Sequence, residues 1–228
     1  MSAATGTSEV FSKVTTMEEA LAPVKDGSVV MIGGFGDAGT PFAMREALAA
    51  RQVRDLTLVA NNADFGSFMY DGGLTGLVCS FPVGPSSGPV KQGIEDGVVD
   101  LQLTPQGTLA ERIRAAGAGL GGVLTPTGLD MEFAADYRVV EHDGRRWLLA
   151  PALHADVALV KGAVADRYGN VVCRSAGINF NPLMAMAASY TVVQVDRVVE
   201  VGEINPQDVT IPSLFVDAVV EVPRQEES

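Results

Sequence analysis

Three amide side chains follow predicted buried strands, and their type and position suit them to chemistry. Asn61 and Asn62 come after an apolar run that ends at Ala60, and Gln106 comes shortly after Leu103. Open parallel α/β sheets bind ligands beyond the carboxyl ends of their strands. An amide N–H fixed there stabilises negative charge that develops on a carbonyl oxygen, by roughly 3 kcal/mol per donor. Gln106 is expected to be the leading donor, because it precedes Gly107 at a strand end, and Asn62 the second. The alternative at each place is a turn that satisfies its own backbone.

A glycine-rich loop, VVMIGGFGDAGTP at residues 29–41, is the second candidate. Residues 34–39 spell G-x-G-x-x-G between a predicted strand and a predicted helix, the order of a dinucleotide-binding turn. That interpretation needs an acidic residue about 20 positions on, at the end of the second strand, to hold the ribose. The strand ends in Asn61-Asn62, and Asp64 already lies in the following loop. Nicotinamide binding therefore stays an alternative, beside a strand-to-helix turn without a ligand.

The elements that must position these groups alternate along the chain. Predicted strands lie at residues 28–32, 55–60, 77–81, 98–103, 156–161, 191–195 and 216–222, and predicted helices at 16–19, 41–51, 89–96, 108–116 and 181–188. Short strands without strict alternation are typical of a parallel sheet covered on both faces. Asp143-Gly144, between two strand-like runs, predicts a β-hairpin. We therefore predict one α/β domain over residues 1–228, with an open, mainly parallel sheet, helices on both faces and a small β-hairpin insertion.

Helix capping by side chains explains several polar residues without a catalytic role. Thr16 and Glu19 have the spacing of a capping box, and so do Thr108 and Glu111. Thr40 is predicted to cap the helix after the glycine loop, with proline at its first position. Glu111, a carboxylate that could otherwise be a nucleophile, is therefore interpreted as part of a cap.

Composition excludes several classes of function. The chain has 228 residues and a formal charge of −12, which disfavours nucleic acid and anionic membrane surfaces as partners. Two histidines and two cysteines, without a C-x-x-C spacing, predict neither a metal site nor a disulfide framework, and we expect Cys79 and Cys173 to be buried and inert. No apolar run approaches the ~18 residues of a membrane span, and no leader pattern is visible, so a soluble, cytoplasmic protein is expected.

A longer signature surrounds the glycine loop. It consists of Asp26-Gly27, the apolar residues 30–32, Gly33-Gly34-Phe35, Gly39 and Pro41. This signature resembles that of the A-type chain of family I CoA-transferases, the 3-oxoacid and 3-oxoadipate enzymes. The resemblance continues through Asn61-Asn62, TPQGTLAERIRAAGAG at 104–119, TPTG at 125–128, ADRYGN at 165–170, NFNPLMAMAA at 179–188 and the late IPSLFVDAVVEV.

The resemblance implies an enzyme that moves CoA between two carboxylic acids, a 3-oxoacid or 3-oxoadipate with succinyl-CoA as donor. In that family a glutamate of the B subunit, within Ser-Glu-Asn-Gly, carries CoA as a thioester. This chain has no Ser-Glu-Asn-Gly. It is therefore expected to hold no catalytic nucleophile, to need a B subunit in an α2β2 heterotetramer, and to use CoA as a substrate with no further cofactor. The alternatives are a short-chain acetate or acetoacetate CoA-transferase, a non-transferring acyl-CoA hydrolase-like relative, and a scaffold that keeps only the fold.

The resemblance also implies which residues bind acyl-CoA. They are Gly33, Gly34, Phe35, Gly36, Asn61, Asn62, Gln106 and Gly107. The glycines would let backbone amides approach the thioester, and Phe35 would pack on the pantetheine arm or plug the core under the loop. Lys91, Arg112 and Arg114 are candidates for the CoA phosphates, although the two arginines also suit a solvated helix face. Bulky residues at 65–70 and the loop PVGPSSGP depart from the family pattern, which leaves the acyl specificity open.

Overall fold

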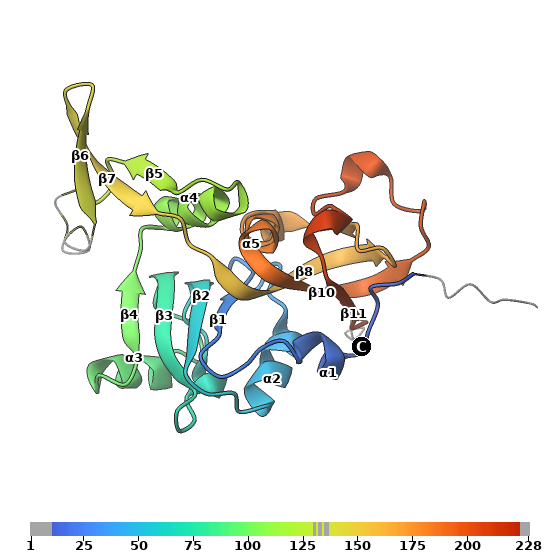
Figure 1. Ribbon diagram of the computed structural model, residues 1–228. Coiled ribbons are helices and arrows are strands. Elements are labelled where there is room, and N and C mark those ends of the chain that lie inside the picture. Colours follow the sequence, from blue (N-terminus) through green and yellow to red (C-terminus); the bar gives the residue numbers. More distant parts are fainter. Residues whose placement is uncertain (1–10, 130, 132–133, 135–136, 224–228) are drawn as a thin grey trace, which may run out of the picture.

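The computed structural model describes residues 11–129, 131, 134 and 137–223, and a parallel sheet forms its centre (Figure 1). The strands of this sheet are β1 (Val29–Ile32), β2 (Leu56–Asn62), β3 (Leu74–Phe81), β4 (Asp100–Leu103), β8 (Ala155–Asp166), β9 (Val171–Val172), β10 (Ala188–Val199) and β11 (Ala218–Glu221). Their order is β11-β10-β8-β1-β2-β3-β4, with every neighbouring pair parallel; β9 pairs antiparallel with β8. The predicted open, mainly parallel sheet is confirmed.

Helices cover both faces of the sheet. They are α1 (Met17–Leu21), α2 (Phe42–Ala50), α3 (Gly88–Glu95), α4 (Gln106–Gly117) and α5 (Asn181–Ala187), with 3-10 turns η1 (Gly66–Phe68), η3 (Ser175–Ile178), η4 (Pro206–Asp208) and η5 (Ser213–Phe215). Val30 and Ile32 of β1 face the core that includes α1, α2 and α3, while Met31 faces the core that includes α4 and α5. Because successive strand residues point to opposite faces, a strand buried on both faces is apolar throughout.

The predicted hairpin belongs to a second, smaller sheet. Its antiparallel strands β5 (Gly122–Thr125), β6 (Arg138–His142) and β7 (Arg145–Pro151) have the order β5-β7-β6, and this sheet lies above the arrowhead of β4 in Figure 1. Asp143 and Gly144 have φ of 51° and 68°, as a two-residue type I′ turn requires. The hairpin is confirmed, and β5 adds a third strand that the sequence did not reveal.

The structure corrects two of the predicted helix starts. The capping box of Thr16 and Glu19 is present. However, α4 begins at Gln106, two residues earlier than predicted, so Thr108 lies inside the helix and caps nothing. Thr40 does not cap α2 either, because its hydroxyl donates to the Gly36 carbonyl 2.7 Å away. In both cases a tertiary or loop contact prevails over the local capping pattern.

Candidate functional site

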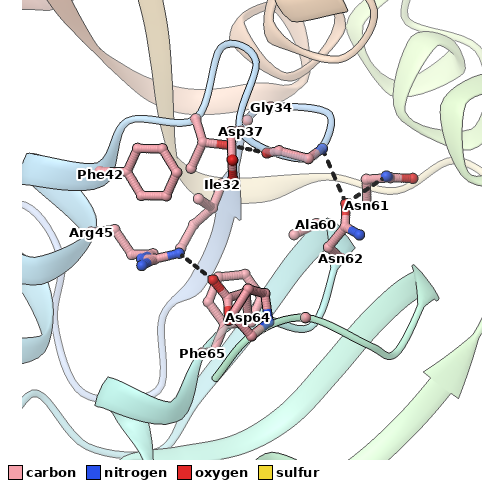
Figure 2. A pocket seen from close by; sticks show the side chains of 15 residues that line it. Ile32, Gly34, Asp37, Phe42, Arg45, Ala60, Asn61, Asn62, Asp64 and Phe65 are labelled. Atoms are coloured by element: carbon pink, nitrogen blue, oxygen red, sulfur yellow. Dashed lines mark hydrogen bonds and ion pairs between the residues drawn. The ribbon is translucent and has the colours of Figure 1, made fainter. Parts of the chain in front are cut away.

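A pocket lies where β1 and β2 end, between the glycine loop and the start of α2 (Figure 2). It is lined by Ile32, Gly33, Gly34, Gly36, Asp37, Thr40, Phe42, Arg45, Ala60, Asn61, Asn62, Asp64, Phe65, Gly84 and Pro85. Its volume is about 70 Å³. Pockets for whole drug-sized ligands usually measure about 300–1,000 Å³, so this chain forms a site for one end of a ligand.

Backbone hydrogen bonds hold the glycine loop, residues 33–41, in place. Gly33 N–H donates to the Leu159 carbonyl of β8, and Phe35 N–H donates to the Ala38 carbonyl, both at 2.9 Å. Gly34, Gly36 and Gly39 have φ of 113°, 59° and 73°. Side chains other than glycine adopt such angles at a cost, which explains why this turn is rich in glycine.

The glycines of this loop have different reasons for lacking a side chain. A Cβ on Gly34 would collide with Thr40 Oγ1 and lie 2.9 Å from Thr40 Cα, and a Cβ on Gly39 would collide with Gly177 Cα. A Cβ on Gly36 would meet no atom within 4 Å. Gly34 and Gly39 are therefore required by packing within the protein. Gly36 is the one among these three whose α-carbon faces open space, as a ligand-facing backbone must.

The side chain of Asn181 holds the glycine loop in place. This residue, at the start of α5, is fully buried, and its Nδ2 donates to the Gly39 carbonyl at 2.9 Å and the Lys161 carbonyl at 2.8 Å. Its Oδ1 lies against Gly33, where a Cβ would collide with it. The packing of Gly33 on this amide therefore joins the loop to β8 and α5.

The three predicted amide side chains form a continuous hydrogen-bonded relay. Gln106 Nε2 donates to Asn61 Oδ1, and Asn61 Nδ2 donates to Asn62 Oδ1, each at 2.7 Å. The backbone N–H of Gly36 also donates to Asn62 Oδ1, at 3.4 Å (Figure 2). A backbone N–H is always a donor, so Asn62 must present its oxygen to the loop, and the orientations of Asn61 and Gln106 follow. The alternative interpretation, in which the Asn pair forms a turn and satisfies its own backbone, does not account for these side-chain bonds.

The three amides of this relay differ in their burial and in their hydrogen-bond partners. Asn61 is only 4% exposed, and both ends of its amide bind the neighbouring amides. Asn62 lines the pocket and uses its oxygen for Asn61 and Gly36, which leaves its Nδ2 donors without a partner among the described hydrogen bonds. Gln106 opens α4 and contacts the pocket only through Asn61. Asn62 is therefore the amide best placed to donate to a ligand.

The pocket gathers five of the eight predicted site residues. These are Gly33, Gly34, Gly36, Asn61 and Asn62. Gln106 joins them through the relay, and Gly107 lies beside it in the first turn of α4. Phe35 does not line the pocket and is 36% exposed, so the prediction that it plugs the core is wrong. Its contact with a pantetheine arm stays a prediction.

Three charged residues that line the pocket, Asp37, Arg45 and Asp64, were not among the predicted site residues. Arg45, from the first turn of α2, has a side chain only 11% exposed, and its Nη1 lies 3.4 Å from Asp64 Oδ2. Its Nη2 lies 3.0 Å from Glu46, and its guanidinium carbon is 5.0 Å from the centre of the Phe42 ring. An arginine on an amphipathic helix ordinarily faces solvent, so the sequence offered no signal for this one.

Asp64 holds the loop that closes the pocket on the β3 side. Its Oδ1 accepts hydrogen bonds from the Ser86 backbone N–H at 2.6 Å and the Ser86 hydroxyl at 2.5 Å. Partial burial works to raise the pKa of Asp64, but the bonds from Ser86 and the charge of Arg45 outweigh it and leave that pKa below the usual value. The carboxylate is therefore ionised at neutral pH and keeps Gly84 and Pro85 against the pocket.

The other charged candidates lie elsewhere. Arg112 is buried and donates to Pro151 O, Gln102 Oε1 and Tyr137 Oη, so the prediction of a solvated helix face is wrong for it. Glu111 pairs with Arg114 at 2.7 Å on the exposed surface of α4, so the predicted capping box of Glu111 is wrong as well. Lys91 is exposed on α3.

The remaining predictions concern cysteine, metal and membrane. Cys79 and Cys173 are free and buried, and burial raises the pKa of the Cys79 thiol to about 11, which makes it unreactive. Within the described ranges, three or more metal-binding side chains gather nowhere. No helix in the described part of the chain is long and apolar enough to cross a membrane.

Comparison with known proteins gives consistent results. The family model of coenzyme A transferase matches residues 14–222. The chain is 42% identical over 212 residues to the A-type chain of 3-oxoadipate CoA-transferase from Pseudomonas putida, covering 91% of this chain and 92% of the relative. It is 38% identical over 215 residues to the alpha chain of acetate CoA-transferase from Escherichia coli K12, covering 92% and 96%. The solved structure of glutaconate coenzyme A-transferase from Acidaminococcus fermentans has the same fold, with a TM-score of 0.84, 22% identity and coverage of 93% and 76%.

Proposed function

The chain belongs to the coenzyme A transferase family, and we propose that it is the A-type subunit of an enzyme that transfers CoA to a 3-oxoacid or to 3-oxoadipate, with succinyl-CoA as donor. Its similarity to a 3-oxoadipate enzyme supports this choice of acid. The similarity to an acetate enzyme, only slightly lower, keeps a short-chain monocarboxylic acid as the second candidate. CoA itself is a substrate, and the proposed reaction uses no separate cofactor.

The observation that carries this proposal is the orientation of Asn62. In the reaction typical of the family, a glutamate supplied by the partner attacks the thioester carbonyl carbon, and negative charge moves to the carbonyl oxygen. Loss of the CoA thiolate gives a mixed anhydride, and attack by CoA on the glutamyl carbonyl then releases the acid and leaves a glutamyl thioester. Asn62 lines the pocket, and because Gly36 and Asn61 occupy its oxygen, its Nδ2 donors stay available for a ligand. A donor held in advance stabilises the oxyanion without reorganising at the moment of reaction.

The partner subunit supplies what this chain lacks. Relatives of nearly the same length are named as one kind of subunit, the A or alpha type, which implies a second kind. The small pocket lies at the surface where strand ends and loops meet. Exposed apolar side chains lie at the carboxyl ends of β3 and β4, namely Phe81, Val83 and Leu103. We assign this edge to the B subunit, in an α2β2 heterotetramer whose active site is completed between the two chains.

Reconstitution tests the proposed function. The purified chain, and the chain co-expressed with a B-type partner that contains Ser-Glu-Asn-Gly, are assayed for CoA transfer from succinyl-CoA to a panel of acids. We expect no turnover by the chain alone and transfer by the pair. Robust turnover by the chain alone would refute the proposal and make the pocket carboxylates Asp37 and Asp64 the candidates for the nucleophile. A pair that hydrolyses acyl-CoA without transfer would support the hydrolase-like alternative.

A further inference from the structure

Arg45 is a cation directed into the pocket on the side opposite Asn62. It comes from α2, whereas Asn62 ends β2, and the two line the same pocket from its two sides (Figure 2). Only 11% of the Arg45 side chain is exposed, although α2 lies on the surface of the protein. An acyl group whose carbonyl oxygen meets Asn62 therefore extends across the pocket toward a guanidinium.

The guanidinium keeps donors for a ligand. It has five N–H groups, of which the described contacts use three. Nε and Nη2 donate to Glu46 Oε1, and Nη1 donates to Asp64 Oδ2 at 3.4 Å. One N–H on each of Nη1 and Nη2 stays without a described partner. One remaining donor on each Nη gives Arg45 the capacity to hold both oxygens of a ligand carboxylate, the bidentate manner in which arginine binds carboxylates.

The protein's own carboxylates hold Arg45 weakly. Asp64 makes its short bonds, of 2.6 and 2.5 Å, to Ser86, and the contact of 3.4 Å with Arg45 is its longest. Glu46 is the next residue along the helix, does not line the pocket, and has a side chain 54% exposed to solvent. The exposed pair with Glu46 contributes about 0–1 kcal/mol, and the less exposed contact with Asp64 is long, so a ligand can compete with both carboxylates.

The surroundings of Arg45 strengthen an interaction with a ligand. Phe42 stacks against the guanidinium, and Ile32, Ala60 and Phe65 complete the apolar part of the lining. Phe65 is 3% exposed and Ala60 is 4% exposed. A charge-assisted hydrogen bond in such a place, away from water, is worth more than the same bond at the surface.

We propose that Arg45 binds a second carboxylate at the far end of the acyl group, so that this pocket selects dicarboxylic over monocarboxylic acids. This inference rests on the proposed function and narrows its substrate class. It is distinct from the chemistry at Asn62, because Arg45 acts on the end of the substrate that does not react. The competing interpretation is that Arg45 and Asp64 form a closed structural pair that only shapes the pocket.

The test compares acids of equal length that differ in the second carboxylate. The chain, assembled with its B-type partner, transfers CoA from one fixed donor other than succinyl-CoA, such as acetyl-CoA, to succinate or butyrate, and to adipate or hexanoate. The measured quantity is the ratio of kcat/KM for the dicarboxylic acid to kcat/KM for its monocarboxylic counterpart. We expect this ratio to exceed 1 in the wild type and to fall on the order of 30-fold in Arg45→Met, since methionine keeps the stem but not the fork.

Two further variants separate ligand binding from structure. Arg45→Lys keeps the charge and loses the fork, so its ratio should fall about fivefold, between the other two values. Asp64→Asn removes the competing carboxylate while its amide oxygen still accepts from Ser86, so its ratio should rise about threefold. Arg114→Met, which breaks an exposed arginine–carboxylate pair on α4, is the matched control and should leave the ratio unchanged.

Clear results would overturn the inference. A wild-type ratio below 1 would assign Arg45 to a structural pair. The same conclusion would follow if Arg45→Met and Arg45→Lys lost transfer to dicarboxylic and to monocarboxylic acids equally. If Arg45→Met does not fold, the direction of change in Arg45→Lys and Asp64→Asn decides. Transfer to monocarboxylic acids with no effect of any variant would refute this inference and leave the proposed function intact. Absence of CoA transfer to every acid would refute the proposed function and this inference with it.

Discussion

Asn62 is the side chain whose removal should slow the reaction most. In Asn62→Ala, assembled with the B-type partner, we expect kcat and kcat/KM to fall together by about 10²-fold, the usual effect of losing one oxyanion donor. Gln106→Ala removes only the outer bond of the relay, at Asn61 Oδ1, so its loss should stay near tenfold. Full kinetics of both variants give the measurement. A rise in KM at unchanged kcat for Asn62→Ala would show a role in substrate binding alone.

Glu111 should be dispensable for the chemistry. Its carboxylate lies on the exposed side of α4, 2.7 Å from Arg114, and does not line the pocket. Glu111→Gln removes one surface ion pair, which solvent screens and which contributes little, and should keep kcat/KM within about tenfold of the wild type. The assay is the same transfer reaction with the assembled pair. A loss of several orders of magnitude would make Glu111 a chemical participant.

The sequence predicted which amide side chains belong to the site but not which of them is best placed to donate to a ligand. Asn61, Asn62 and Gln106 were recognisable because neutral amides after buried strands are placed where such sheets bind ligands. Gln106 was expected to be the leading donor, and the structure gives this place to Asn62, because Gln106 uses its Nε2 for Asn61. Arg45 could not be predicted, since its burial depends on the contact between α2 and the loop that holds Asp64.

At the scale of elements, the glycine loop allows a comparison of two glycines. If Gly34 served only the approach of backbone amides to the thioester, as the resemblance implied, Gly34→Val would reduce activity far more than stability; however, a Cβ there would collide with Thr40. We therefore expect Gly34→Val to lower the melting temperature and the activity together. Gly36→Ala should cost only about 1–2 kcal/mol for its φ of 59°, or roughly 2–8 °C in melting temperature.

The activity of Gly36→Ala, measured well below its melting temperature, completes this comparison. Its Cβ would project into open space beside Asn62, where the ligand is expected, so kcat/KM should fall at least about tenfold while the protein stays folded. Gly27→Ala serves as the control, because Gly27 also has positive φ and an open Cβ position but lies before β1, away from the pocket. Equal activities of Gly36→Ala and Gly27→Ala would show that Gly36 does not face the ligand.

Element boundaries show how far local sequence patterns reach. The capping box of α1 was predictable because it involves only neighbouring residues. The start of α4 was not, because Gln106 enters the helix while its side chain binds Asn61, which is 45 positions away in the chain. β8 and β10 also extend well beyond their predicted ranges, since they pair with each other from Ala155 and Ala188 to Asp166 and Val199. Pairing of this kind depends on the partner strand and leaves no mark in either strand alone.

At the scale of the whole molecule, Arg112 connects the small sheet to the main body. Its side chain is 5% exposed, and it donates from α4 to Pro151 O of β7 at 2.9 Å, to Gln102 Oε1 of β4 at 3.2 Å and to Tyr137 Oη at 2.9 Å. Burial lowers the pKa of Arg112, while Tyr137 works in the opposite direction. A buried cation is tolerated when hydrogen bonds satisfy it, and these acceptors lie on separate elements.

Removing this connection should destabilise the protein without impairing CoA binding. Arg112→Met leaves the Pro151 carbonyl and the Gln102 amide oxygen without their donor, at a cost of about 3 kcal/mol, or roughly 6–12 °C in melting temperature for a chain of this size. Arg114→Met, on the exposed side of the same helix, should shift the melting temperature by less than about 2 °C. Below the melting transition, the KM for acyl-CoA should be unchanged in Arg112→Met. A raised KM at unchanged stability would instead return Arg112 to the phosphate-binding role that the sequence left open.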